Sequence, residues 1–169
     1  MIAGIPLSIL TAVYTAYLFA QAKARDLWQS SLLPPHLLIQ AVLLGSAVLL
    51  PLTLVSLDGS PADLFDNAFP ATVWILTGAS LIHLLLILGE LSLTHATAHA
   101  RVATWEMMRG RYRTSFWIGI ALAIAGGALP LAAFFGYLSI GMGGVLLAIA
   151  GVIFYEHAYV QAGQSVPLA

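Results

Sequence analysis

Charged side chains are scarce in this sequence. Only six Lys or Arg and seven Asp or Glu occur among 169 residues, and 60% of the residues are hydrophobic. A soluble domain has roughly a quarter charged residues, so this chain could not cover a globular surface with polar groups. The composition therefore excludes a soluble globular protein, a disordered protein and a nucleic-acid-binding protein, and it indicates an integral membrane protein.

Cysteine is absent altogether. The chain can therefore form no disulfide, no thiolate-bound iron–sulfur cluster and no cysteine-ligated zinc site. A redox cofactor would have to use histidine or belong to a partner protein.

The sequence consists mainly of long apolar stretches that contain no Asp, Glu, Lys or Arg. A transmembrane helix needs about 20 apolar residues. The stretches predict an all-α, polytopic membrane protein with one domain, residues 1–169, in which about five transmembrane helices form a four-helix-type bundle plus one extra span. The expected spans are residues 2–21, 37–57, 71–94, 114–136 and 138–157. We expect the third helix to continue to Met108 as a cytoplasmic extension; a helix lying in the membrane interface is the alternative.

The connecting segments differ in charge. Asp58, Asp63 and Asp66 follow the second span. All basic residues follow the first or the third span: Lys23, Arg25, Arg101, Arg109, Arg111 and Arg113. Because cytoplasmic loops are enriched in Lys and Arg, we expect a multi-pass protein of the inner (cytoplasmic) membrane, with its N-terminus outside and its C-terminus in the cytoplasm.

Proline or glycine residues occur within the second, fourth and fifth spans. Pro51 and Pro130 lie within spans, where proline usually bends a helix. A tight turn is expected near Gly136 and Tyr137, between the last two spans. Four glycines on the fifth span could let a neighbouring helix approach closely: Gly141, Gly143, Gly144 and Gly151.

Ionisable residues within spans are the candidates for function. Such a residue costs about 2.5–3.5 kcal/mol on insertion scales, so it tends to face the bundle interior and to have a use. His83 lies near the middle of the third span, Glu90 follows two turns later on nearly the same face, and Glu156 ends the fifth span. His83 and Glu90 could begin a proton path from the cytoplasm. The alternative interpretation places Glu90 in water at the interface and gives His83 a hydrogen bond to a neighbouring helix.

The remaining histidines give weaker indications. His95 and His99 share a helix face with Glu106, but the zinc-protease motif is missing, so a solvated cytoplasmic face is favoured over a metal site. A b-type haem needs two histidines that face each other at similar depth. His36 with His157 is conceivable, although nothing in the spacing supports this pair. No metal or haem site is therefore predicted.

Several segments, in this order, resemble the polysulfide reductase NrfD/PsrC family along nearly the whole chain. They are residues 12–16 and 21–30, Glu90 and Leu91 with His95, residues 109–117, and residues 155–157 with 160–168. The chain departs from the family pattern at Ser31, where many relatives carry proline. It also departs in length, because family members resemble a tandem of two four-helix bundles, and this chain resembles the C-terminal half alone.

The resemblance implies a function. Family members are membrane subunits that exchange electrons between the quinone pool and an iron–sulfur subunit, which serves a molybdopterin enzyme or a multihaem cytochrome. They typically bind no haem, and their quinone pocket is associated mainly with the N-terminal bundle. In some members buried acidic and histidine residues are proposed to conduct protons, which makes His83, Glu90, His95 and Glu156 the proton-path candidates here.

The resemblance also implies partners. We expect a respiratory-complex subunit that anchors the complex, is non-catalytic or quinone-interacting, and contributes a proton path. The expected partners are a companion N-terminal-half membrane subunit, the iron–sulfur subunit, the molybdopterin or multihaem subunit, and the lipid bilayer. No cofactor is expected in this chain, and menaquinone or ubiquinone is expected in the assembled complex. The alternatives are a structural membrane anchor without conduction and a small b-type cytochrome.

Overall fold

The computed structural model describes residues 4–54, 62–93 and 97–166, with side chains described from residue 67 onward in the second range. Every regular element within these ranges is helical. Four helical segments are long and apolar enough to cross a membrane: Leu33–Leu52, Asn67–Ser92, Arg113–Phe135 and Leu138–Ser165. A shorter apolar helix covers Gly4–Ala20. The expectation of an all-α, polytopic membrane protein is therefore confirmed.

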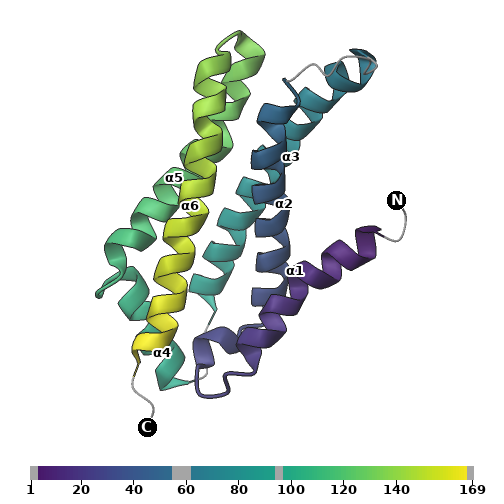
Figure 1. The fold of residues 1–169 in the computed structure, drawn as a ribbon. Coiled ribbons are helices and arrows are strands. Elements are labelled where there is room, and N and C mark those ends of the chain that lie inside the picture. Colours follow the sequence, from purple (N-terminus) through teal and green to yellow (C-terminus); the bar gives the residue numbers. More distant parts are fainter. Residues whose placement is uncertain (1–3, 55–61, 94–96, 167–169) are drawn as a thin grey trace.

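The four long segments stand side by side as a bundle (Figure 1). It consists of α2 (Leu33–Leu52), α3 (Ala62–Ser92), α5 (Arg113–Ala128) and α6 (Leu138–Ser165). Helix α6 packs against both α5 and α2, and α3 packs against α2 and α5. Helix α1 (Gly4–Ala20) packs against α2, but Figure 1 shows it leaning away from the bundle axis toward its N-terminus.

The expected extension of the third helix to Met108 is wrong. Helix α3 ends at Ser92, and a separate helix α4 covers Ala98–Met108. Thr97 begins α4 as its N-cap, because its hydroxyl oxygen accepts a hydrogen bond from the backbone N–H of Ala100 at 3.2 Å. The break lets α4 pack against α5, α6 and the short 3-10 helix η1 (Asp26–Gln29), which a straight continuation of α3 could not reach.

Prolines mark the ends of helices more than kinks in their middles. Pro51 stands one residue before the end of α2, and the helix stops there. Pro130 lies near the start of η2 (Leu129–Phe135), where the fourth span changes from α-helix to 3-10 helix. The span then ends at Gly136, whose positive φ of 86° requires a residue without a Cβ atom. The predicted turn between the last two spans is therefore confirmed.

Glycines bring the backbones of α5 and α6 into close contact. A Cβ atom on Gly119 would lie 2.7 Å from the backbone nitrogen of Tyr155, and one on Gly151 would lie 2.7 Å from that of Ala123. Gly144 is similarly crowded by η2, whereas Gly143 has nothing within 4 Å of the same position. Close approach is thus confirmed for Gly151 and Gly144 but not for Gly143.

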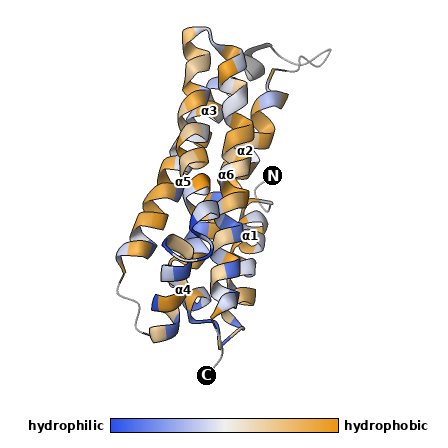
Figure 2. Cartoon of the chain, turned by 90° about the vertical axis from the view of Figure 1, so that its left-hand side faces the viewer, coloured by the Kyte–Doolittle hydropathy of each residue, from blue (hydrophilic) through white to orange (hydrophobic). Residues whose placement is uncertain are grey.

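Polar residues gather at one end of the bundle. Figure 2 shows hydrophobic residues along most of the helices, and hydrophilic residues mainly around α4 and the nearby C-terminal end of α6. Large apolar side chains such as Trp74, Leu88 and Leu146 are exposed on the outside of the bundle. Such a surface suits a hydrocarbon environment and not water.

We predict that Gly151→Ala destabilises the protein, because the added Cβ atom would overlap the backbone of α5. Overpacking of this kind costs about 1–3 kcal/mol. Gly143→Ala is the matched control: the same change on the same helix meets open space, so stability is retained or slightly raised. Thermal unfolding in detergent measures both, and equal midpoints for the two variants would contradict the packing described here.

Candidate functional site

Helices α2, α3 and α6 enclose a group of polar side chains in the interior of the bundle. We call this group the polar core; its members are Ser30, His36, Gln40, His83, Glu90, Tyr155 and Glu156. The three helices contain no lysine or arginine. The polar core is therefore built from hydrogen bonds and not from ion pairs with cations on these helices.

Two histidines form the centre of the polar core. His36 on α2 is 4% exposed and His83 on α3 is 0% exposed. Nε2 of His36 lies 2.8 Å from Nδ1 of His83. One of these nitrogens must carry a hydrogen and donate, while the other accepts, so the two tautomers are coupled. The two facing nitrogens are in direct hydrogen-bond contact, which leaves no room for an iron atom between them.

Tyr155 on α6 closes the space beside this pair. Its ring centroid lies 5.2 Å from that of His36 and 5.3 Å from that of His83. The Tyr155 side chain is fully buried. The histidine pair is thus covered on one side by an aromatic ring and excluded from the surrounding lipid.

Glu90 lies at the end of the polar core nearest to α4. It is 4% exposed and accepts a hydrogen bond of 2.5 Å from the hydroxyl of Ser30. The Ser30 oxygen in turn accepts from the backbone N–H of Leu32 at 3.2 Å, just before α2 begins. Of the two interpretations of Glu90, the structure therefore favours a carboxyl inside the protein over one in interfacial water.

Glu156 lies at the other end of the polar core. It is half-buried, and its Oε1 accepts a 2.6 Å hydrogen bond from Nε2 of Gln40. Helix α6 continues to Ser165, so Glu156 lies well inside the helix. His36 and Gln40 are one turn apart on α2, which brings the histidine pair and the Gln40–Glu156 bond within about 6 Å of each other along the axis.

Some buried polar atoms of this region have no hydrogen-bond partner in the part of the chain that the structure describes. They are Nε2 of His83, the hydroxyl oxygen of Tyr155 and Oγ of Ser80. Ser80 precedes His83 by one turn of α3, so both lie on the same face. Buried polar groups normally have partners. Two of these residues, His83 and Tyr155, pack against each other at the histidine pair, whereas the Ser80 side chain lies against Gly127 of α5.

The other histidines that the structure describes take no part in the polar core. His95 lies outside the described residues. His99 is half-buried on α4, and His157 is exposed, with its ring 6.4 Å from that of Tyr112. His36 and His157 are therefore not brought together. Within residues 4–54, 62–93 and 97–166, no three His, Cys, Asp or Glu side chains are grouped as metal ligands.

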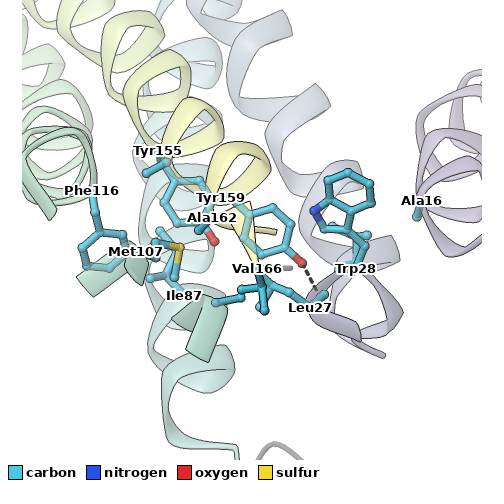
Figure 3. Close-up of a cluster of buried hydrophobic side chains, with 13 residues drawn as sticks. Ala16, Leu27, Trp28, Ile87, Met107, Phe116, Tyr155, Tyr159, Ala162 and Val166 are labelled. Carbon is cyan, nitrogen blue, oxygen red and sulfur yellow. Dashed lines mark hydrogen bonds between the residues drawn. The ribbon is translucent and has the colours of Figure 1, made fainter. Parts of the chain in front are cut away.

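The segment around Trp28 packs against the C-terminal end of α6. We call this contact the C-terminal clasp; it comprises Arg25, Leu27, Trp28, Tyr159 and residues 163–166. Figure 3 labels its buried members Leu27, Trp28, Tyr159 and Val166. Nη1 of Arg25 donates to the carbonyl oxygens of Gln164 and Val166, both at 2.8 Å. These bonds satisfy carbonyls at the C-terminus of α6, where a cation is also favoured by the helix dipole.

Two buried side chains complete the C-terminal clasp. Tyr159 donates from its hydroxyl to the carbonyl of Leu27 at 2.9 Å, as drawn in Figure 3. The indole of Trp28 lies against Gly163, where a Cβ atom would meet the ring nitrogen. Two segments more than 130 residues apart in the chain are therefore one structural unit.

A family model described as "Polysulphide reductase, NrfD" matches residues 1–166. The chain belongs to the NrfD family. No curated protein and no solved structure matches it. Membership fits a membrane subunit of a quinone-linked oxidoreductase, and proteins of the NrfD family lie in the membrane and partner with other respiratory subunits. The two segments of the C-terminal clasp are among those that carried the resemblance in the sequence.

Sequence reasoning identified His83, Glu90 and Glu156 but missed their partners Ser30, His36 and Gln40. His36 entered only as a conceivable haem ligand with His157, and Gln40 lay in a stretch defined only by its lack of charge. The signal was present in the spacing: His36 and Gln40 are four residues apart within an apolar helix and therefore share a face.

We predict that Arg25→Ala destabilises this NrfD-family protein, because it removes charge-assisted hydrogen bonds to the end of α6. Such bonds contribute about 1.5–3 kcal/mol. Lys23→Ala removes the same charge from an exposed position two residues away and should have little effect. Unfolding midpoints in detergent compare the two, and a loss of the same size in both would mean that the C-terminal clasp contributes nothing specific.

Proposed function

We propose that this chain is a membrane subunit of a quinone-linked respiratory oxidoreductase in the cytoplasmic membrane, which anchors the complex and carries protons through α2, α3 and α6. The polar core is the observation on which the proposal depends. Titratable side chains are costly at this depth, and they are retained where they serve transport or catalysis. Here two carboxyls and two imidazoles form three hydrogen-bonded contacts between the helices of one bundle, and His36, His83 and Glu90 are buried in its interior.

The order of these groups along the bundle supports a path. Glu90 lies two residues before the end of α3, near the end where the basic loops gather. If that end faces the cytoplasm, as the distribution of basic residues indicates, Glu90 is the entry group. The histidine pair follows about 10 Å deeper, by the rise of the seven residues from Glu90 to His83, and Glu156 lies beyond it.

The histidine pair suits proton transfer by its chemistry. An imidazole can accept a proton at one ring nitrogen and release a proton from the other. A proton that reaches His83 would thereby cross the 2.8 Å contact to His36, with both rings exchanging tautomers. The unpaired Nε2 of His83 and the hydroxyl of Tyr155 offer hydrogen bonds to water molecules, which would bridge the longer step from Glu90.

Electron transfer belongs to the partners in this proposal. The chain contains no cysteine to hold an iron–sulfur cluster. We propose that an iron–sulfur subunit with a molybdopterin or multihaem subunit supplies the electron carriers, and that menaquinone or ubiquinone binds in the assembled complex. A companion membrane subunit, resembling the N-terminal half of other family members, would cover part of the exposed apolar surface of the bundle.

A structural anchor without conduction is the competing function. The same three hydrogen bonds also hold α2 and the loop before it against α3 and α6: Ser30–Glu90, His36–His83 and Gln40–Glu156. Polar contacts between membrane helices contribute about 0.6–2 kcal/mol each. Only a variant that keeps the hydrogen bonds while removing proton exchange separates the two functions.

Glu156→Gln and Glu90→Gln meet this requirement. A glutamine carbonyl still accepts the bond from Gln40 or Ser30, but it cannot take up and release a proton at working pH. In the complex reconstituted in vesicles, we predict that either change nearly abolishes the protons translocated per electron, while electron transfer in uncoupled vesicles is retained. The measurement is proton uptake against quinol oxidation.

Glu106→Gln is the matched control, because Glu106 lies on α4 outside the polar core and its contact to the backbone N–H of Arg111 survives the change. The Glu106→Gln change should leave the number of protons translocated per electron unaltered. An unchanged ratio in both polar-core variants, with full assembly of the complex, would reject conduction and leave the anchor function.

A further inference from the structure

Helix α4 and the start of α5 carry a surface that is both basic and aromatic. We call it the basic aromatic surface; its exposed residues are Arg101, Val102, Trp105, Arg109, Arg113 and Trp117. It lies at the end of the bundle where the hydrophilic residues gather (Figure 2). Neither the polar core nor the C-terminal clasp accounts for it.

The two faces of α4 are distinct. One face packs into the protein through Ala100, Ala103 and Met107, which are buried in the core. The opposite face exposes 47% of Val102 and 54% of Trp105. A helix in water would place charged residues on such an outer face, whereas here a large indole and a β-branched side chain lie there beside arginine.

The exposed indoles are held in place. Nε1 of Trp117 donates to the carbonyl of Met108 at 3.2 Å, which ties the start of α5 to the end of α4, and 54% of Trp117 remains exposed. Trp105 lines a shallow hollow of about 320 Å³ together with Ala98, Arg101 and Val102. The surface therefore offers a preformed depression with an aromatic wall and a guanidinium group at its edge.

The net charge of this region is positive. Residues 97–137 contain four arginines and one glutamate, a net formal charge of +3. The glutamate, Glu106, accepts the backbone N–H of Arg111 at 2.9 Å and so serves the turn between α4 and α5. The partner that fits the basic aromatic surface is therefore anionic.

We propose that the basic aromatic surface binds the headgroup of an anionic phospholipid. The surface lies between the end of α3 at Ser92 and the start of α5 at Arg113, the level at which the apolar segments leave the bilayer. Tryptophan is enriched at that level, and helices with apolar and basic residues lie in the interface with anionic lipids. The guanidinium forks match phosphate oxygens, and Val102 and Trp105 contact the adjoining acyl chains.

Tryptophan fluorescence provides the test, because exposed indoles report contact with brominated lipid chains. The full chain, with any subunits that co-purify, is titrated in neutral detergent with brominated phosphatidylglycerol or brominated phosphatidylcholine. We expect saturable quenching by phosphatidylglycerol at a lower mole fraction than by phosphatidylcholine. Arg109→Gln and Arg113→Gln should each raise that mole fraction about fivefold, the effect of one basic residue near an anionic surface.

Lys23→Gln is the matched control, since it removes an exposed charge from the first loop and should leave the titration unchanged. Melting in lipid-free detergent identifies a variant that fails to fold, and either arginine variant suffices alone. The proposal is overturned if phosphatidylcholine quenches equally, if the arginine variants titrate as wild type, or if inorganic phosphate displaces the lipid completely. It is also overturned if the arginine changes release a soluble subunit of the complex while lipid quenching persists, because the surface would then bind an acidic protein.

Discussion

The hydrocarbon interior of a membrane offers no water, so every polar side chain buried in this bundle must find its hydrogen bonds within the protein. That constraint determines how α2, α3 and α6 face one another. His36 must meet His83, Gln40 must meet Glu156, and the loop before α2 must bring Ser30 to Glu90. A rotation of α2 by one residue would leave its polar side chains against lipid, at about 1–3 kcal/mol for each unpaired group. The apolar side chains provide no comparable selectivity, because lipid solvates them as well as a neighbouring helix does.

Helix α6 must be held in a fixed position for these hydrogen bonds to form. Glycines on the α5–α6 contact let the two backbones touch, and the nitrogen of Tyr155 lies directly beneath Gly119. The Tyr155 ring then packs against the histidine pair. At the lower end, Arg25 binds the last carbonyls of α6, which prevents the helix from sliding along its axis. Close packing above and a charged cap below therefore hold Glu156 opposite Gln40.

The sequence predicted what depends on local pattern and missed what depends on pairing. Apolar length predicted the four long segments, whereas the first expected span, residues 2–21, contains only the shorter apolar helix Gly4–Ala20. Gly136 predicted the turn because few other residues adopt its backbone conformation. His83, Glu90 and Glu156 stood out as rare ionisable residues. Their partners did not, since Ser30, His36 and Gln40 belong to another helix and its preceding loop, and helix contacts are not encoded in spacing alone. The break between α3 and α4 was missed for a related reason: α4 is stabilised by burying Ala103 and Met107 against distant segments, while its own sequence continues the helical pattern of α3.

The distribution of unpaired polar atoms bears on whether the polar core is only structural. A core selected for stability satisfies its donors and acceptors, because each unsatisfied one costs as much as a hydrogen bond contributes. In the described part of this chain four buried side-chain atoms have no hydrogen-bond partner within the protein, and two of them belong to His83 and Tyr155, whose rings pack against each other at the histidine pair. A hydrogen bond between a serine and a backbone carbonyl would hold two helices together equally well. The two histidines have more ring nitrogens that can exchange a proton than such a contact requires. A histidine whose second ring nitrogen has no partner within the protein is expected where a group changes its hydrogen-bond partner during function, and proton transfer through an imidazole requires that change.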